Sequence, residues 1–404
     1  MEFYHDILEN LLDKLIDYRG KTPKKTLSGV PLVTAKIVKN GTINGYTEYI
    51  AEEDYDKWMV RGFPKVGDVI LTTEAPLGEV ALLKEEKVAL AQRIVCLRGK
   101  DNVLDNTYLK YYLQSGKGQK SLSARESGTT VTGIKQAELR RVDIEYPAYD
   151  DQRRIASILS SLDRKIELNN KINADLEEMA QAIFKNWFID FEPFKDGKFV
   201  DSELGMIPEG WKVGNIGDIV EFQNGFAFSS KDFSEYGEYK IITIKSVQDG
   251  CLLSEGSSKI SEYPTKMPAY CKLQSGDILL SLTGNVGRCC LVTEPHLLLN
   301  QRVAKIKAKE SFDNSFSYAL FRLKETKELL ISISRGTAQA NLSPVEASKL
   351  PMVIPSEDVR KKFSLFSDSI MDKIISIHIE NARLSLLRDT LLPRLMSGEL
   401  EIPE

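Results

Sequence analysis

An internal repeat constrains this chain more than any other feature of its sequence. The string Gly-Asp-Val-Ile-Leu at 67–71 returns as Gly-Asp-Ile-Leu-Leu at 276–280. The dipeptide Gln-Arg at 92–93 returns at 301–302 with the same offset, and further along the offset shortens by a single residue. Because two copies that stay in register over so long a stretch do not arise by chance, we expect two structurally similar units in one chain.

Each copy begins with a globular part in which short β-type runs alternate with turns. Asn-Gly turns lie at 40–41 and 44–45 of the first copy, and a helix-like stretch begins at Tyr108. The β-type runs lie at 30–38, 68–73, 79–83 and 89–97. This mixture predicts an α/β (α+β) fold class, and nothing in the pattern selects one particular fold.

Each copy ends in a long helix with one apolar seam. The first helix is expected to begin near Asp150 and to end before Pro193, and the second begins near Ser356. In the first helix the seam residues recur at alternating steps of four and three, which is a heptad pattern. The first seam contains Ile155, Leu159, Leu162, Ile166, Asn169, Asn173, Leu176, Ala180, Ile183 and Trp187. The second contains Phe363, Ile370, Ile374, Ile377, Asn381, Leu384, Leu387 and Leu391.

The two helices have matching seams. Asn173 and Asn381 occupy equivalent positions of the repeat, and a polar seam residue can fix the register of a helix pair. Each helix could also be buried against its own globular part. We favour an antiparallel coiled-coil pair, because two matched helices with one apolar stripe each can cover both stripes.

Three strings in the chain resemble the specificity subunit (HsdS) of type I restriction–modification systems. Ala-Ile-Phe-Lys-Asn-Trp-Phe-Ile-Asp-Phe-Glu-Pro at 182–193 resembles the end of that family's central helix. Ile-Pro-Glu-Gly-Trp at 207–211 resembles the entry to its second target-recognition domain, and Leu-Pro-Arg-Leu-Met-Ser-Gly-Glu-Leu at 392–400 resembles its C-terminal signature. The resemblance covers the whole chain, and the elements follow in the family's order.

The resemblance implies five segments, which are target-recognition domain 1 at 1–150, a central spacer helix at 151–195, a linker at 196–210, target-recognition domain 2 at 211–355, and a C-terminal spacer helix and tail at 356–404. Each recognition domain would read one half of a bipartite double-stranded DNA site. The helices would carry two methyltransferase subunits, and motor-nuclease subunits would join through these. S-adenosylmethionine, ATP and magnesium would belong to the partners, with no cofactor on this chain.

Motifs of enzymes do not occur in the sequence. There is no phosphate-binding G-x-x-x-x-G-K-[ST] loop, no G-x-G-x-x-G after a strand, no Asn-Pro-Pro-aromatic motif and no G-x-S-x-G elbow. The five cysteines form no C-x-x-C pair, and with three histidines a metal site is not expected. We therefore predict a non-catalytic chain.

Charge and hydropathy bear on partners and location. The formal net charge of −4 argues against a nucleic-acid binder, whereas lysine and arginine outnumber acidic residues at 109–141. The first residues have no signal-peptide pattern, and no apolar run is long enough to span a bilayer. With free thiols besides, we expect a cytoplasmic protein without membrane contact.

Candidate DNA-contacting residues are polar residues near glycines at positions shared by both copies, since such side chains hold phosphates and base edges. In the first copy they are Lys36, Lys39, Thr72, Thr73, Gln92, Arg93, Arg125, Thr129, Thr130 and Lys135. In the second they are Lys245, Ser281, Thr283, Asn285, Gln301, Arg302, Arg335, Thr337, Gln339 and Asn341. A repeated residue can instead support the shared fold.

The sequence thus predicts a DNA sequence-specificity subunit. The alternative is a non-catalytic scaffold with two binding lobes that do not contact DNA, and a third reading is an enzyme with an unrecognised site. Salt-sensitive, sequence-selective duplex binding separates the first reading from the scaffold, and methyl transfer by the chain alone would identify the enzyme.

Overall fold

The structure is a computed structural model that describes residues 1–18, 20–128, 132–336 and 340–400. The chain divides into two compact units. Unit 1 contains Met1–Ile166 with Leu384–Glu404, and unit 2 contains Glu167–Arg383. Each unit therefore combines one globular part of the repeat with portions of both long helices.

An antiparallel sheet forms the centre of unit 1. Its order is β2 (Leu12–Asp17), β10 (Ile94–Gly99), β7 (Val69–Thr73) and β8 (Leu77–Leu82). Every residue of β7 is buried, because both faces of the sheet are covered. Val69 and Leu71 lie in one core with α3 (Asn106–Gln114), while Ile70 lies in a second core with β3 (Val30–Val33). Side chains alternate between the faces of a strand, so one apolar run serves both cores.

The second core of unit 1 is closed by a small sheet. In it β3 pairs antiparallel with β6 (Tyr49–Ile50) and parallel with β9 (Ala89–Leu90). The other elements are β1 (Phe3–Ile7), paired with β11 (Asp143–Pro147), α1 (Leu8–Leu11), β4 (Val38–Lys39), β5 (Thr42–Ile43), η1 (Glu52–Asp54), α2 (Tyr55–Trp58), α4 (Gly116–Ser123) and α5 (Gln136–Arg140).

Unit 2 repeats this topology. Its main sheet has the order β15 (Val220–Asn224), β22 (Val303–Ala308), β19 (Ile278–Ser281) and β20 (Cys289–Leu291). In its second sheet, β16 (Tyr239–Ile242) pairs parallel with β21 (Leu297–Leu299), as β3 does with β9. The other elements are β12 (Phe199–Val200), β13 (Ile207–Pro208), β14 (Lys212–Asn215), α7 (Ile216–Ile219), β17 (Lys259–Ile260), β18 (Lys272–Leu273), α8 (Asn314–Arg322), α9 (Lys324–Ser332), α10 (Pro344–Ser348), β23 (Pro351–Ile354) and the 3₁₀ turns η2 (Glu192–Phe194), η3 (Ser230–Asp232), η4 (Ala269–Cys271) and η5 (Ser311–Asp313).

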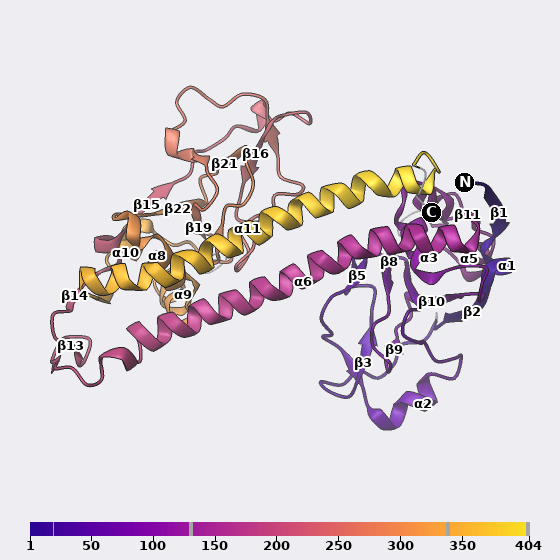
Figure 1. The fold of residues 1–404 in the computed structure, drawn as a ribbon, viewed down its shortest axis with the longest axis horizontal. Helices are drawn as coiled ribbons and strands as arrows, with labels where there is room; N and C mark the ends of the chain where they lie inside the picture. Colours follow the sequence, from indigo (N-terminus) through magenta and orange to yellow (C-terminus); the bar gives the residue numbers. More distant parts are fainter. Residues whose placement is uncertain (19, 129–131, 337–339, 401–404) are drawn as a thin grey trace. The chain divides into compact units, whose positions relative to one another are not determined.

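Two long helices, α6 (Tyr149–Phe188) and α11 (Glu357–Met396), follow the globular parts (Figure 1). Each carries acidic residues in its first turn, which favours a helix N-terminus. In unit 1, the start of α6 and the end of α11 share one core, which contains Ile155, Leu159 and Leu395. In unit 2, Phe184 near the end of α6 contacts Phe363 near the start of α11. The helices therefore run antiparallel, and the predicted fold class is confirmed.

The predicted seam is wrong at one position. Leu387 is 46% exposed, and the neighbouring Arg388 turns toward α6, where its guanidinium donates to Asp163 at 3.0 Å. The apolar heptad continues at Leu384 and Leu391, which are partly buried. The physical reason for the shift is a buried cation–carboxylate cluster, which periodicity of apolar residues does not reveal.

The globular part of each unit, called a lobe below, is joined to the long helix that follows it. An equivalent residue in the first turns of that helix makes the contact in both units. In unit 1 this is Gln152, which is fully buried, accepts from the Asp105 backbone N–H and donates to the Pro147 carbonyl, both at 2.9 Å. In unit 2 the equivalent Arg360 pairs with the buried carboxylate of Asp313. Each lobe is thus fixed to its helix by a polar contact that is shielded from water.

Candidate nucleic-acid interface

The Gln-Arg dipeptides lie at the same end of the main sheet in both units. In unit 1, Arg93 immediately precedes β10 and its carbonyl accepts from the Thr73 N–H at 3.0 Å. In unit 2, the Arg302 carbonyl accepts from the Leu282 N–H at the same distance. Because of this strand pairing, each dipeptide lies beside the loop that follows the neighbouring strand.

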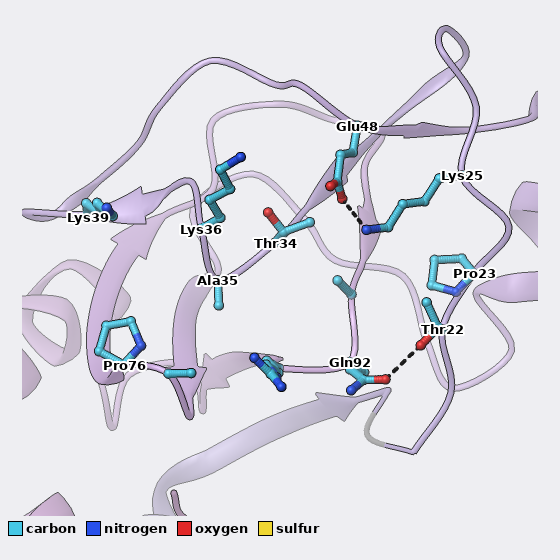
Figure 2. A pocket seen from close by; sticks show the side chains of 13 residues that line it. Thr22, Pro23, Lys25, Thr34, Ala35, Lys36, Lys39, Glu48, Pro76 and Gln92 are labelled. Carbon is cyan, nitrogen blue, oxygen red and sulfur yellow. Dashed lines mark hydrogen bonds and ion pairs between the residues drawn. The ribbon is translucent and has the colours of Figure 1, made fainter. Parts of the chain in front are cut away.

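A groove of about 470 Å³ opens beside this dipeptide in unit 1 (Figure 2). Lys25, Lys36 and Lys39 line it together with Gln92 and Arg93. The groove therefore gathers cationic and amide side chains, the residue types that contact phosphates and base edges.

Internal contacts fix several of the side chains in this groove. Thr22 donates to the side-chain oxygen of Gln92 at 2.8 Å, and the Lys25 ammonium lies 2.7 Å from the Glu48 carboxylate. The Gln92 carbonyl is thereby occupied, which leaves its amide N–H groups for a ligand. Half-exposed Arg93 is likewise paired, since its Nε lies 2.7 Å from Oε1 of Glu74.

In unit 2, uncharged side chains contact the arginine that is equivalent to Arg93. Exposed Arg302 donates to the side-chain oxygen of Asn341 at 3.4 Å, and the hydroxyl of Thr283 donates to the same oxygen at 2.8 Å. In the part of the chain that the structure describes, no carboxylate forms an ion pair with Arg302. The charge of Arg302 is therefore not offset by a carboxylate among the described residues.

The structure brings some of the candidate residues together and buries others. In unit 1, Lys36, Lys39, Gln92 and Arg93 share the groove, whereas the hydroxyl of fully buried Thr72 accepts from the Glu79 N–H at 2.9 Å. The remaining described candidates of this copy do not line the groove. They are Thr73, which is buried, Lys135, which is exposed, and Arg125, which lies 3.5 Å from Glu138 and 3.4 Å from Asp143.

In unit 2, Thr283, Arg302 and Asn341 meet, while Ser281 is fully buried and accepts from the Arg288 N–H at 3.1 Å. Exposed candidates there are Lys245, Asn285, Gln301 and Arg335. The candidates Thr129, Thr130, Thr337 and Gln339 lie outside the described residues.

Sequence reasoning missed Glu74, Thr22 and Lys25. Glu74 and Thr283 occupy the same position of the repeat, so the exchange of a carboxylate for a hydroxyl was visible in the two copies. Thr22 and Lys25 lie in a segment without a repeat signal, and only the fold brings them to Gln92.

The described residues show neither a metal-binding cluster nor a membrane-spanning helix. Among them, no group of histidine, cysteine, aspartate and glutamate is placed to hold a metal ion. Their helices include none that is long and apolar enough to cross a bilayer.

Comparison with known proteins identifies the family to which this arrangement of two similar lobes and two paired long helices belongs. The sequence profile of the family described as "Type I restriction modification DNA specificity domain" matches residues 13–178 and 208–384. The chain belongs to this family. It is accordingly a specificity subunit, the non-catalytic recognition subunit of a restriction–modification complex.

Named relatives support this assignment over most of their length. The MjaIX specificity subunit of Methanocaldococcus jannaschii is 30% identical over 399 residues, which cover 95% of this chain and 91% of the relative. The HindI specificity subunit of Haemophilus influenzae is 26% identical over 70% of this chain and 74% of its own length. A crystal structure of the S subunit of a type I system from M. genitalium shares the fold, with a TM-score of 0.59 at 17% identity over 98% of this chain and 96% of that one.

Proposed function

We propose that this chain reads a bipartite duplex target, with residues 1–150 as one recognition domain and 211–355 as the other. The observation that carries the proposal is the Gln-Arg dipeptide, which both units present at the same end of the same sheet. Because the flanking side chains differ between the units, the two domains would prefer different base sequences. Shared residues suit the phosphates, which are the same in every sequence, where their neighbours are also alike in the two units.

The proposed contact surface is the groove beside Arg93 in the first domain and the surface around exposed Arg302 in the second. Lys36, Lys39 and Gln92 would contact DNA in the first domain, and Gln301 and Asn341 in the second. The buried hydroxyls of Thr72 and Ser281 would serve by shaping the sheet end. Arg125, Lys135, Lys245, Asn285 and Arg335 remain predicted contacts.

We further propose that α6 and α11 carry two methyltransferase subunits, through which motor-nuclease subunits join. Large apolar side chains on α11 support this, since Leu365 is 75% exposed and Phe366 58% exposed. Exposed apolar surface of this kind is typical of contacts with other proteins. S-adenosylmethionine, ATP and magnesium would be bound by these partners, and the assembly would act in the cytoplasm.

Selection of duplexes from a random library tests this function. We expect the chain in complex with its methyltransferase subunits to select two short specific blocks around a gap of unspecified bases. Since the net charge of the chain is −4, much of the phosphate contact should come from the partner, so the chain alone should bind weakly. One continuous specific block, or tight specific binding by the chain alone, would contradict the proposal.

A further inference from the structure

The two arginines of the proposed interface have different neighbours, although they occupy the same position of the repeat. Arg93 is paired through Nε with the carboxylate of Glu74 at 2.7 Å. At the position of Glu74 the second copy has Thr283, and Arg302 contacts the amide of Asn341 instead. The charge of one guanidinium is therefore offset by a carboxylate, whereas the contact found for the other among the described residues is with a neutral amide.

A second exchange accompanies the first. The position of Asn341 is occupied by Gly133 in the first copy, and both residues form the equivalent bridge to the loop after the central strand, Gly133 with Glu74 and Asn341 with Thr283. A Cβ atom on Gly133 would lie 2.9 Å from the Cβ of Glu74 and 2.9 Å from the Thr73 carbonyl. The absence of a side chain at Gly133 thus leaves room for Glu74. Glu74 and Gly133 of the first copy are therefore exchanged together for Thr283 and Asn341 in the second.

The neighbour determines which groups of the guanidinium remain for a ligand. The Glu74 carboxylate lies 2.7 Å from Nε, and among the described residues no hydrogen bond engages the two terminal amino groups of Arg93, which can therefore donate side by side to O6 and N7 of guanine. The carboxylate cancels the charge that would otherwise attract a phosphate, and it would repel a phosphate that approached Arg93. Arg302 keeps its charge and is exposed, which suits a phosphate.

We propose that Glu74 is a specificity-determining residue that makes Arg93 a reader of a guanine edge, whereas Arg302 holds a phosphate. This inference rests on the proposed function, because it requires both arginines to face DNA. It predicts a difference between the two half-sites that the repeat by itself would not suggest. Replacing Arg93 should remove a base preference that also requires Glu74. Replacing Arg302 should reduce the salt dependence of binding, whereas replacing Arg93 should not.

The test compares variants of the full chain in complex with its methyltransferase subunits. Affinity for the selected duplex and for single-base variants of it is measured at several salt concentrations. Arg93→Ala should remove the preference at one guanine, by roughly tenfold or more, with an unchanged slope of log affinity against log salt. Arg302→Ala should weaken binding to every duplex alike and reduce that slope by about one.

Glu74→Thr and Glu74→Gln decide the role of the carboxylate. Both should lower the preference at the guanine that depends on Arg93, and both should steepen the salt slope by about one, because the charge of Arg93 becomes available to a phosphate. Gln keeps the size of Glu and can still accept from Nε, so it separates the charge from the fold of the loop. Glu52→Gln removes an exposed carboxylate of the same lobe outside the groove and should change neither quantity.

The outcomes separate the inference from the proposed function. If Arg93→Ala alters binding but both Glu74 variants keep the wild-type preference and salt slope, Glu74 has no such role while the interface stands. If neither arginine variant alters binding, the interface itself is wrong and the inference falls with it. Thermal melting of each variant shows that it is folded, and Glu74→Gln decides the matter should Glu74→Thr misfold.

Discussion

At the scale of single residues, Asp163 connects three helices of unit 1. Its carboxylate accepts from the Lys110 ammonium at 2.8 Å and from the Tyr111 hydroxyl at 2.6 Å, both on α3, and from Arg388 of α11 at 3.0 Å. The side chain of Lys110 is only 5% exposed. Asp163 is thus the counter-charge of a buried lysine and joins the recognition lobe to both long helices.

Removing this carboxylate charge should destabilise unit 1. In Asp163→Asn the charge of Lys110 stays buried without its counter-ion, and we expect a loss of roughly 2–3 kcal/mol, below the full cost of breaking a buried pair because Asp163 is partly exposed. Denaturant unfolding measures the loss. Glu328→Gln, in an exposed helical pair with Lys324, should change the free energy of unfolding by less than about 0.5 kcal/mol. Equal losses for the two variants would refute this role of Asp163.

The same cluster gives the variant a pH dependence. Burial raises the pKa of Asp163, but Lys110, Tyr111 and Arg388 outweigh burial and hold its pKa below the usual value. A carboxyl that is more acidic in the folded state stabilises the protein fully above its unfolded pKa of about 4, and this contribution is lost as the pH falls through the folded pKa. The difference in stability between wild type and Asp163→Asn should therefore shrink below about pH 4.

At the scale of elements, asparagines interrupt the apolar seam between α6 and α11 in unit 2. Asn169 donates to the side-chain oxygen of Asn381 at 2.8 Å, and Asn381 donates to Asn170 at 2.8 Å. Asn169 is 1% exposed and Asn381 9% exposed, so these amides satisfy one another away from water. Asn173 is buried one turn further along, and its amide has no hydrogen-bond partner in the described part of the chain. Such a polar contact favours one register of a helix pair over its neighbours.

A double-mutant cycle measures this contact. Asn169→Leu or Asn381→Leu alone breaks the bond between the two amides, although Asn169 still has Glu380 and Asn381 still has Asn170 as a partner, and should cost about 0.5–1.5 kcal/mol. The double variant replaces both amides by apolar groups and should cost less than the sum of the single changes, with a coupling of about 1 kcal/mol or more. Denaturant unfolding of the four proteins gives the coupling. Strict additivity would show that the two amides do not stabilise the pair jointly.

At the scale of the whole molecule, each recognition lobe has its own core but also packs on both helices. The core of unit 1 includes Ile155 and Leu159 of α6 and Leu395 of α11, and the core of unit 2 includes Phe184 and Phe363. The sheets of each lobe therefore form a core of their own. The surface of the lobe that faces the two helices packs against them. A lobe can therefore be replaced only by another lobe whose helix-facing surface is similarly apolar.

Exchange of residues 1–150 for the first recognition domain of another family member tests this modularity. We expect one half of the DNA target to change and the other half to persist, because the sheet ends that carry Arg93 and Arg302 belong to separate cores. Selection from a random duplex library reads out both halves. A chimera that matches the donor's apolar face toward Ile155 serves as the control for folding. If both halves change, the lobes do not read independently.

The sequence by itself determined the duplication, the mixed fold class, the two long helices and the Gln-Arg position, because repeats, local turn chemistry and heptad periodicity are written along the chain. Only the tertiary structure decided the neighbours of individual side chains. Glu74 meets Arg93 because two strands lie side by side, and Arg388 replaces Leu387 in the seam because Asp163 lies opposite, 225 positions away. Such contacts join residues remote in sequence, where no local pattern records which side chains will share a buried charge or a groove.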